Sequence, residues 1–138
     1  MALLVPDVGE VVLLNNLLAG GSLENWTLKL FKTNVTPAES DTAVSYTVAD
    51  FTGYSNVTLT RTQSGSTWAT AATSAGTTSS TYGSSAQTWT LSGTAQTIYG
   101  YYVVGATSTT LLFAEAFAAS RTLNASDVLN LTPKLQLD

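Results

Sequence analysis

From residue 25 onward apolar and polar side chains alternate, and this period of two constrains the fold more than any other feature of the chain. Trp26, Leu28 and Leu30 share one parity, as expected for a strand with one buried face. Short segments of this kind, separated by turn residues, recur up to residue 137 and are typical of a sandwich or a barrel. We therefore expect a mainly β protein: an antiparallel two-sheet sandwich, jelly-roll-like, with strands from about residue 25 to residue 137.

The segment before these strands has the period of a helix. Pro6 suits a first helical turn, and Asp7 and Glu10 complement the positive end of the helix dipole. Gly20-Gly21 supplies a left-handed stop. We expect one N-terminal helix over residues 6–19, with a broad apolar stripe that packs against a sheet or a partner. The stripe consists of Val8, Val11, Val12, Leu14, Leu17 and Leu18.

Later segments carry more specific expectations. Residues 110–118 are apolar on both faces, which predicts a central strand. Residues 71–86 are rich in Ser, Thr, Ala and Gly, which fits either a flexible loop or a thin polar strand. Pro133 divides the last strand and implies an edge position or a bulge, and Gly100 implies a bulge or a close backbone contact.

Length and composition limit the class of protein. A chain of 138 residues is expected to form a single domain, residues 1–138, around one core. The chain has no Cys, no apolar run long enough to span a bilayer, and no basic region typical of a signal peptide. The net charge is −4 and the five cations form no run, so we expect neither nucleic-acid nor membrane binding.

The chain lacks most residue types that perform acid–base or nucleophilic chemistry. It has no His and no Cys, and its nine acids are scattered. We expect no enzyme, no catalytic residue, no cofactor and no metal site. Glu115 is the one acid within an apolar strand, and we interpret it as paired with Arg61, Arg121 or a backbone donor, or as facing a subunit interface. A buried general base is the alternative.

Aromatic residues are the candidates for binding. Trp26 and Trp89 share the parity of neighbouring leucines, which indicates core positions. Exposed rings could stack on sugars, so a carbohydrate-binding attachment module is an open alternative. We expect partner contacts at Trp68, Tyr82, Tyr99 and Tyr101.

Five phrases, in order along nearly the whole chain, resemble small virion proteins of tailed bacteriophages. They are VPDVGEVVLLNNLL, WTLKLFKTNVTPAESDT, TIYGYYVV, TLLFAEAF and DVLNLTPKLQL. Together they look like capsid decoration, or cement, proteins with jelly-roll folds. The resemblance carries over no functional residue, and residues 71–86 depart from it.

The resemblance implies a structural virion protein on the capsid exterior, made in the host cytoplasm. Such a protein would stabilise the assembled head by clamping neighbouring subunits of the phage major capsid protein, as a homo-oligomer, a dimer or a trimer, on the shell. The acidic balance suits the outer face better than the DNA-facing lumen. A head-fibre, neck or tail component is the alternative within the same class.

Overall fold

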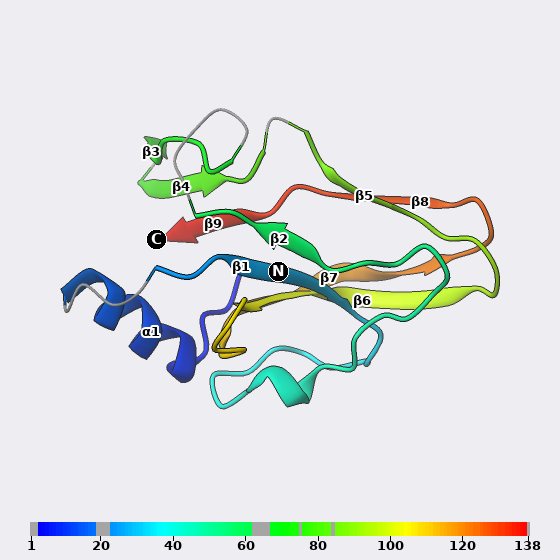
Figure 1. The fold of residues 1–138 in the computed structure, drawn as a ribbon, viewed down its shortest axis with the longest axis horizontal. Coiled ribbons are helices and arrows are strands. Elements are labelled where there is room, and N and C mark those ends of the chain that lie inside the picture. The colour runs from blue at the N-terminus through cyan, green and yellow to red at the C-terminus, as the bar shows by residue number, and fades with distance from the viewer. Residues whose placement is uncertain (1–2, 19–22, 62–66, 75, 84, 138) are drawn as a thin grey trace.

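The chain folds as a helix followed by strands that form antiparallel sheets (Figure 1). The computed structural model describes residues 3–18, 23–61, 67–74, 76–83 and 85–137. Within these ranges the elements are α1 (Asp7–Leu18), β1 (Trp26–Phe31), the 3-10 helix η1 (Ala43–Ser45), β2 (Val57–Leu59), β3 (Ala72–Ser74), β4 (Thr77–Thr81), β5 (Gln87–Thr90), β6 (Gln96–Gly105), β7 (Leu111–Leu123), β8 (Val128–Leu131) and β9 (Lys134–Leu137).

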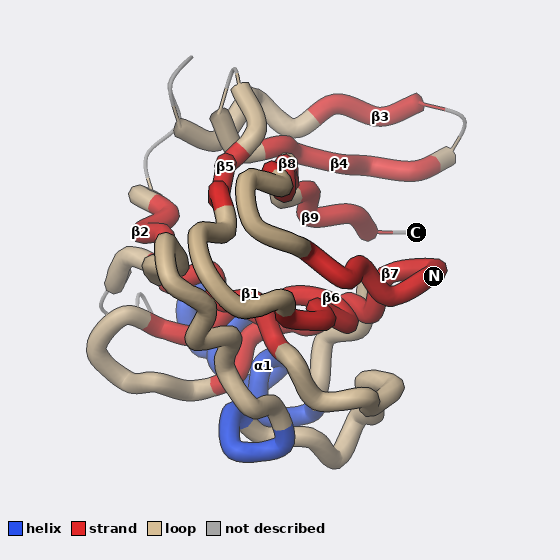
Figure 2. Tube along the Cα trace, turned by 90° about the vertical axis from the view of Figure 1, so that its right-hand side faces the viewer, coloured by secondary structure: helices blue, strands red, loops and turns tan. Residues whose placement is uncertain are grey.

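The sheets form two layers. One layer is the four-stranded sheet with the order β2-β1-β6-β7. The opposite layer contains the sheets β3-β4-β9 and β5-β8 (Figure 2). Because β4 leads into β5 and β8 leads into β9, these two small sheets continue one another along the chain. The predicted mainly β sandwich with one N-terminal helix is confirmed.

Large apolar side chains fill the space between the layers. Leu28 and Leu30 of β1 and Val103 of β6 belong to the same buried cluster as Trp89 of β5. Trp26 is part of this cluster, so the core positions predicted for both tryptophans are confirmed. Each such side chain stabilises the fold by roughly 1.5–3 kcal/mol when it leaves water.

The outer face of the four-stranded sheet is covered as well. Phe31, Tyr46 and Tyr102 form a second buried cluster there, in which the rings of Tyr46 and Tyr102 stack with centroids 5.0 Å apart. Tyr46 comes from the long segment between β1 and β2. The central sheet is therefore buried on both faces.

β7 is an edge strand, and the prediction of a central strand over residues 110–118 is wrong. Within the described residues its neighbour in the sheet is β6. Phe113 belongs to the core between the layers, whereas Ala114 belongs to the cluster on the outer face. The two apolar faces of this strand thus reflect the layers above and below it, not strands on both sides.

The segment before α1 is attached to β7. Leu4 and Ala114 form an antiparallel bridge, with N–O distances of 3.0 and 2.9 Å for the two hydrogen bonds. Pro6 is buried, and its carbonyl accepts the N–H of Gly9 in the first turn of the helix. A Cβ at Gly9 would overlap the carbonyl oxygen of Leu112, so glycine lets the helix backbone lie directly on the strand.

Three further expectations are confirmed. The described part of residues 71–86 contains the β3–β4 hairpin, which is the thin polar strand alternative. Pro133 separates β8 from β9, and both strands lie at sheet edges. Gly100 lies at a register shift between β6 and β7, where a Cβ would overlap the ring of Phe31. The stop predicted at Gly20-Gly21 lies outside the described residues.

Candidate functional site

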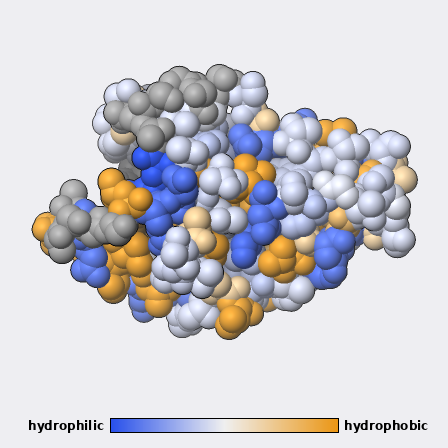
Figure 3. All heavy atoms as spheres, viewed as in Figure 1, coloured by the Kyte–Doolittle hydropathy of each residue, from blue (hydrophilic) through white to orange (hydrophobic). Residues whose placement is uncertain are grey.

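One side of α1 is an apolar surface that the described part of the chain leaves uncovered. The exposed fractions are 37% for Val8, 57% for Val11, 55% for Leu14 and 80% for Leu18, and these residues are termed the α1 face. Figure 3 shows apolar surface at the end of the molecule where α1 lies, on the left of the view. Contiguous exposed apolar surface is typical of interaction sites.

The opposite side of α1 is the one that packs. Val12 and Leu13 contact the core cluster, and Gly9 lies on β7. With 3.6 residues per turn, the α1 face points away from these residues. The helix is thus apolar on both sides: of the predicted stripe, Val12 contacts the core cluster, whereas the α1 face remains exposed.

Charge is distributed unevenly around the α1 face. Asp7 and Glu10 lie in the first turn and are exposed, and the last turn carries no basic residue within the described part of the helix. The surface is therefore an apolar strip with a negative rim at one end.

A groove of about 880 Å³ opens between β7 and β8 and is termed the β7–β8 groove. β7 pairs with β6 in one layer and β8 pairs with β5 in the other, so the two consecutive strands diverge from the turn that joins them. In this turn the N–H of Asn124 donates to Oδ2 of Asp127 over 2.8 Å. Residues that line the groove include Glu115, Phe117, Arg121, Leu123, Asp127 and Leu129.

Glu115 lies half-buried in the groove and is held by a residue of β6. The hydroxyl of Tyr101 donates to its Oε2 atom over 2.6 Å. Burial, together with the hydrogen bond to Glu115 and its charge, raises the pKa of Tyr101 above its ordinary value, so the phenol stays a neutral donor. The predicted pairing of Glu115 with Arg61, Arg121 or a backbone donor is therefore wrong, because its hydrogen-bond partner is Tyr101.

Trp68 and Tyr82 belong to an aromatic cluster around Trp26. The ring of Trp68 meets Trp26 at 75° and Tyr82 at 72°, with centroids 5.6 and 5.3 Å apart. The guanidinium of Arg61 lies 4.9 Å from the centre of the Trp26 ring, and burial lowers the pKa of Arg61. Edge-to-face packing of this kind offers no flat stacking platform.

The four predicted contact residues do not form one surface. Tyr82 and Tyr101 are only 8% and 3% exposed and are core residues, whereas Trp68 and Tyr99 are half-buried. This corrects the expectation that Tyr82 and Tyr101 face a partner. Alternation along β6 failed to separate inside from outside because both faces of its sheet are covered.

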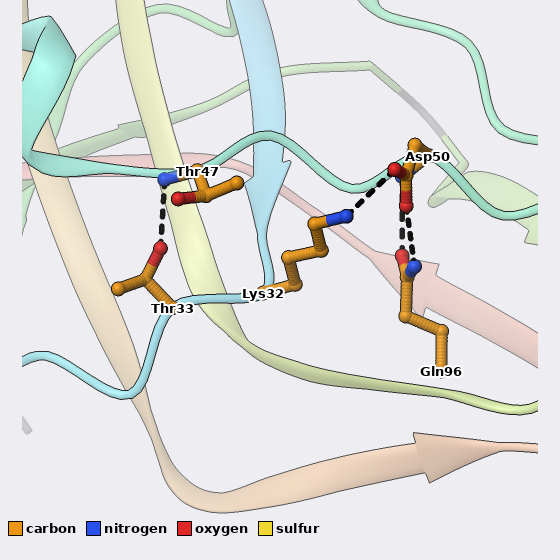
Figure 4. A network of polar contacts seen from close by, with 5 residues as sticks. All are labelled: Lys32, Thr33, Thr47, Asp50 and Gln96. Atoms are coloured by element: carbon orange, nitrogen blue, oxygen red, sulfur yellow. Dashed lines mark hydrogen bonds and ion pairs between the residues drawn. The ribbon is translucent and has the colours of Figure 1, made fainter.

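A polar network fixes the segment between β1 and β2 to the sheet (Figure 4). Lys32 Nζ lies 2.6 Å from Asp50 Oδ2, and Gln96 Nε2 donates to Asp50 Oδ1 over 2.6 Å. The hydrogen bond from Lys32, and to a smaller extent that from Gln96, lowers the pKa of Asp50. The N–H of Thr47 donates to Thr33 Oγ1 over 2.8 Å. The network is exposed and tethers a loop.

Comparisons with known proteins assign no family. The chain matches no protein-family model and no curated protein. Among the described residues, no cluster of acidic side chains is placed to hold a metal ion. No helix in the described ranges has the length and apolar character needed to cross a membrane. Within the described ranges, the α1 face and the β7–β8 groove are two surfaces suited to recognition.

Sequence reasoning expected an apolar stripe on α1 that packs against a sheet or a partner, but it did not separate the exposed side of the helix from the packed side, and it missed the groove. The α1 face had a signal, because Val11 and Val12, and Leu13 and Leu14, are adjacent apolar pairs that point to different sides of a helix. The groove had no signal in the sequence, because it arises from two consecutive strands that join opposite layers.

Proposed function

We propose that this protein decorates and stabilises the outside of an assembled phage capsid by clamping neighbouring subunits of the major capsid protein. The sequence resemblance suggests the class, and the exposed α1 face is the observation that carries the proposal. A folded sandwich that leaves a strip of valine and leucine side chains in water has a surface suited to docking. The proposed occupant is an apolar patch on the capsid shell.

The energetics suit a clamp of two modest contacts. Full burial of a Val or Leu side chain contributes roughly 1.5–3 kcal/mol, and the four residues of the α1 face are already part-buried. Part of this gain offsets the entropy lost on association. A second contact on a neighbouring subunit would raise the effective concentration of the first. α1 and the β7–β8 turn lie at opposite ends of the long axis, as such a clamp requires (Figure 1).

Charge supports the outer face of the shell as the location. The net charge of −4 disfavours the DNA-facing lumen, where phosphates would repel the domain. Asp7 and Glu10 rim the α1 face, so the matching patch on the shell is expected to carry Lys or Arg beside its apolar part. Assembly as a dimer or a trimer on a symmetry axis of the shell is part of the proposal.

Carbohydrate binding is not favoured by the aromatic geometry. Trp26 is buried, and the ring of Trp68 stands at 75° to it. A head-fibre, neck or tail component would use the same kind of apolar surface, and location on the particle separates that alternative from decoration.

The test compares the native protein with Leu14→Asp and Val44→Asp in co-sedimentation with expanded heads of the phage that encodes it. Leu14 is in the α1 face, whereas Val44 is 93% exposed on η1 and is the matched control. We expect saturable binding of the native protein and of Val44→Asp, and a loss of at least about tenfold in affinity for Leu14→Asp. Unassembled capsid subunits should bind weakly, because the clamp needs two neighbours.

Two outcomes would reject parts of the proposal. Binding of Leu14→Asp as tight as that of the native protein would remove the α1 face as the docking surface. Failure of the native protein to bind heads, or antibody labelling confined to the tail, would reject decoration and favour the tail component.

A further inference from the structure

We infer that the β7–β8 groove is a second docking surface, which takes an extended segment of a partner chain and seats one lysine or arginine of that segment beside Glu115. The inference rests on the proposed function, because it names the second contact of the clamp. The free strand edges, the bulge in β7 and the carboxylate of Glu115 support it.

The free strand edges favour an extended polypeptide as the occupant. β7 and β8 each lie at the edge of their sheets. Leu4 bridges β7 at Ala114, and beyond Ala114 no described segment forms a bridge with the outer edge of β7. An unpaired edge presents N–H and C=O groups that pair with an added strand.

The bulge in β7 provides room for another main chain. Ala116 is paired with Gly100 and Arg121 with Ile98, so Tyr99 alone stands opposite residues 117–120. The extra residues of a bulge leave the ladder with the neighbouring strand. Three of these residues that line the groove are small and exposed at its rim, which permits close approach of a partner backbone: Ala118, Ala119 and Ser120.

The carboxylate of Glu115 favours a cation. Its Oε2 atom accepts the hydroxyl of Tyr101, and the carboxylate has no other hydrogen bond within the described residues. A half-buried carboxylate with a single neutral donor is incompletely compensated for the water it has lost. Phe117 and Leu129 line the groove as apolar walls along which the stem of a lysine or arginine could lie.

The remaining charges of the groove agree with this choice. Arg121 lines the groove, but the ion pair formed among the described residues is Lys32–Asp50, so Arg121 forms no ion pair with Glu115. Asp127 adds a second carboxylate, which is engaged by Asn124 in the turn. The groove thus holds two carboxylates and one guanidinium, a balance that admits one cation.

The test titrates the isotopically labelled full-length protein with short acetylated peptides of alternating valine and threonine that differ only in a central lysine, norleucine or glutamate. We expect backbone amide shifts confined to residues 115–130. The lysine peptide should bind at least about tenfold tighter than the norleucine peptide, and salt should reduce this advantage. Glu115→Gln can still accept the Tyr101 hydroxyl, but it should lose the preference for the lysine peptide. Glu39→Gln, at an exposed residue outside the groove, should keep that preference.

A second variant keeps the test independent of charge. Ala119→Trp, at an exposed lining residue, should block all the peptides while leaving unfolding unchanged. Equal binding of the lysine and norleucine peptides, shifts outside the groove, or full binding by Glu115→Gln would overturn the inference. The titration contains no heads, so its failure together with normal head binding would reject the groove and leave the proposed function standing. Normal peptide binding together with failure to bind heads would reject decoration and leave the groove as a docking surface.

Discussion

Tyr101 and Glu115 face each other at paired positions of β6 and β7, and the hydroxyl of one lies 2.6 Å from the carboxylate of the other. The bond joins a core residue to a residue of the groove. It therefore couples the packing of the sandwich to the charge that we assign to partner recognition.

Removing the Tyr101 hydroxyl should destabilise the fold measurably. Tyr101→Phe leaves the half-buried carboxylate without its donor, and we expect a loss of about 1–3 kcal/mol in the free energy of unfolding. Denaturant unfolding measures this loss. Tyr99→Phe, at a half-buried tyrosine on the same strand, is the control and should cost less than about 0.5 kcal/mol. Equal losses would show that the bond contributes nothing specific.

The two sides of α1 should respond oppositely to the same substitution. Leu13→Asp places a charge against the core cluster and is expected to cost about 2–4 kcal/mol. Leu14→Asp alters a residue that is 55% exposed and should change stability by less than about 0.5 kcal/mol. Thermal or denaturant melting of the two purified variants checks the difference. A large loss for Leu14→Asp would mean that the α1 face is packed in solution.

Gly9→Ala sets helix propensity against a steric overlap. Alanine favours a helix over glycine by about 1 kcal/mol. The added Cβ would overlap the carbonyl oxygen of Leu112, a backbone atom that cannot move without displacing β7. We expect the steric overlap to outweigh the gain in helix propensity, with a net loss of about 1–3 kcal/mol in the free energy of unfolding. Asn15→Ala, at an exposed position of the same helix, should instead stabilise by a few tenths of a kcal/mol. Stabilisation by both variants would contradict the close approach.

Glu24 should contribute stability that is lost in acid. Burial opposes its ionisation, but hydrogen bonds from the hydroxyl and N–H of Ser108 and from the N–H of Thr107 hold its pKa below the ordinary 4.5. A lowered folded-state pKa gives stability that is present above pH 4.5 and disappears as pH falls through the folded-state value. The native protein should therefore exceed Glu24→Gln in stability at neutral pH, and the difference should shrink below pH 4.5. Urea midpoints across this range measure it, and a difference that grows in acid would contradict the assignment.

The sequence predicted elements better than it predicted their neighbours. The period of three and four located α1, and the period of two located β1, because both report local burial. The position of β7 was misjudged because an apolar face records what lies above a strand and not what lies beside it. The half-buried pair of Tyr101 and Glu115 depends on the register between two strands, which no local pattern encodes.

The candidate surfaces were harder to predict for the same reason. Tyr82 and Tyr101 were expected at partner contacts because aromatic side chains dominate binding hot spots. Both are core residues, since a second layer covers each of them. The predicted stripe on α1 contained the α1 face, but the packed side is instead occupied by Gly9, Val12 and Leu13, which depends on how the helix lies on β7.

The course of β7 has a mechanical consequence. The strand passes under α1 at Leu112 and reaches the turn at Asn124, at the other end of the molecule (Figure 1). Hydrogen bonds in an antiparallel pair run perpendicular to the strands. A pull along the long axis would load the bonds between β6 and β7 in shear, so that many must yield together, whereas a pull across the sheet would unzip them in sequence. We therefore expect the β6–β7 pair to resist a pull along the line that joins the two ends of the molecule more strongly than a pull across the sheet.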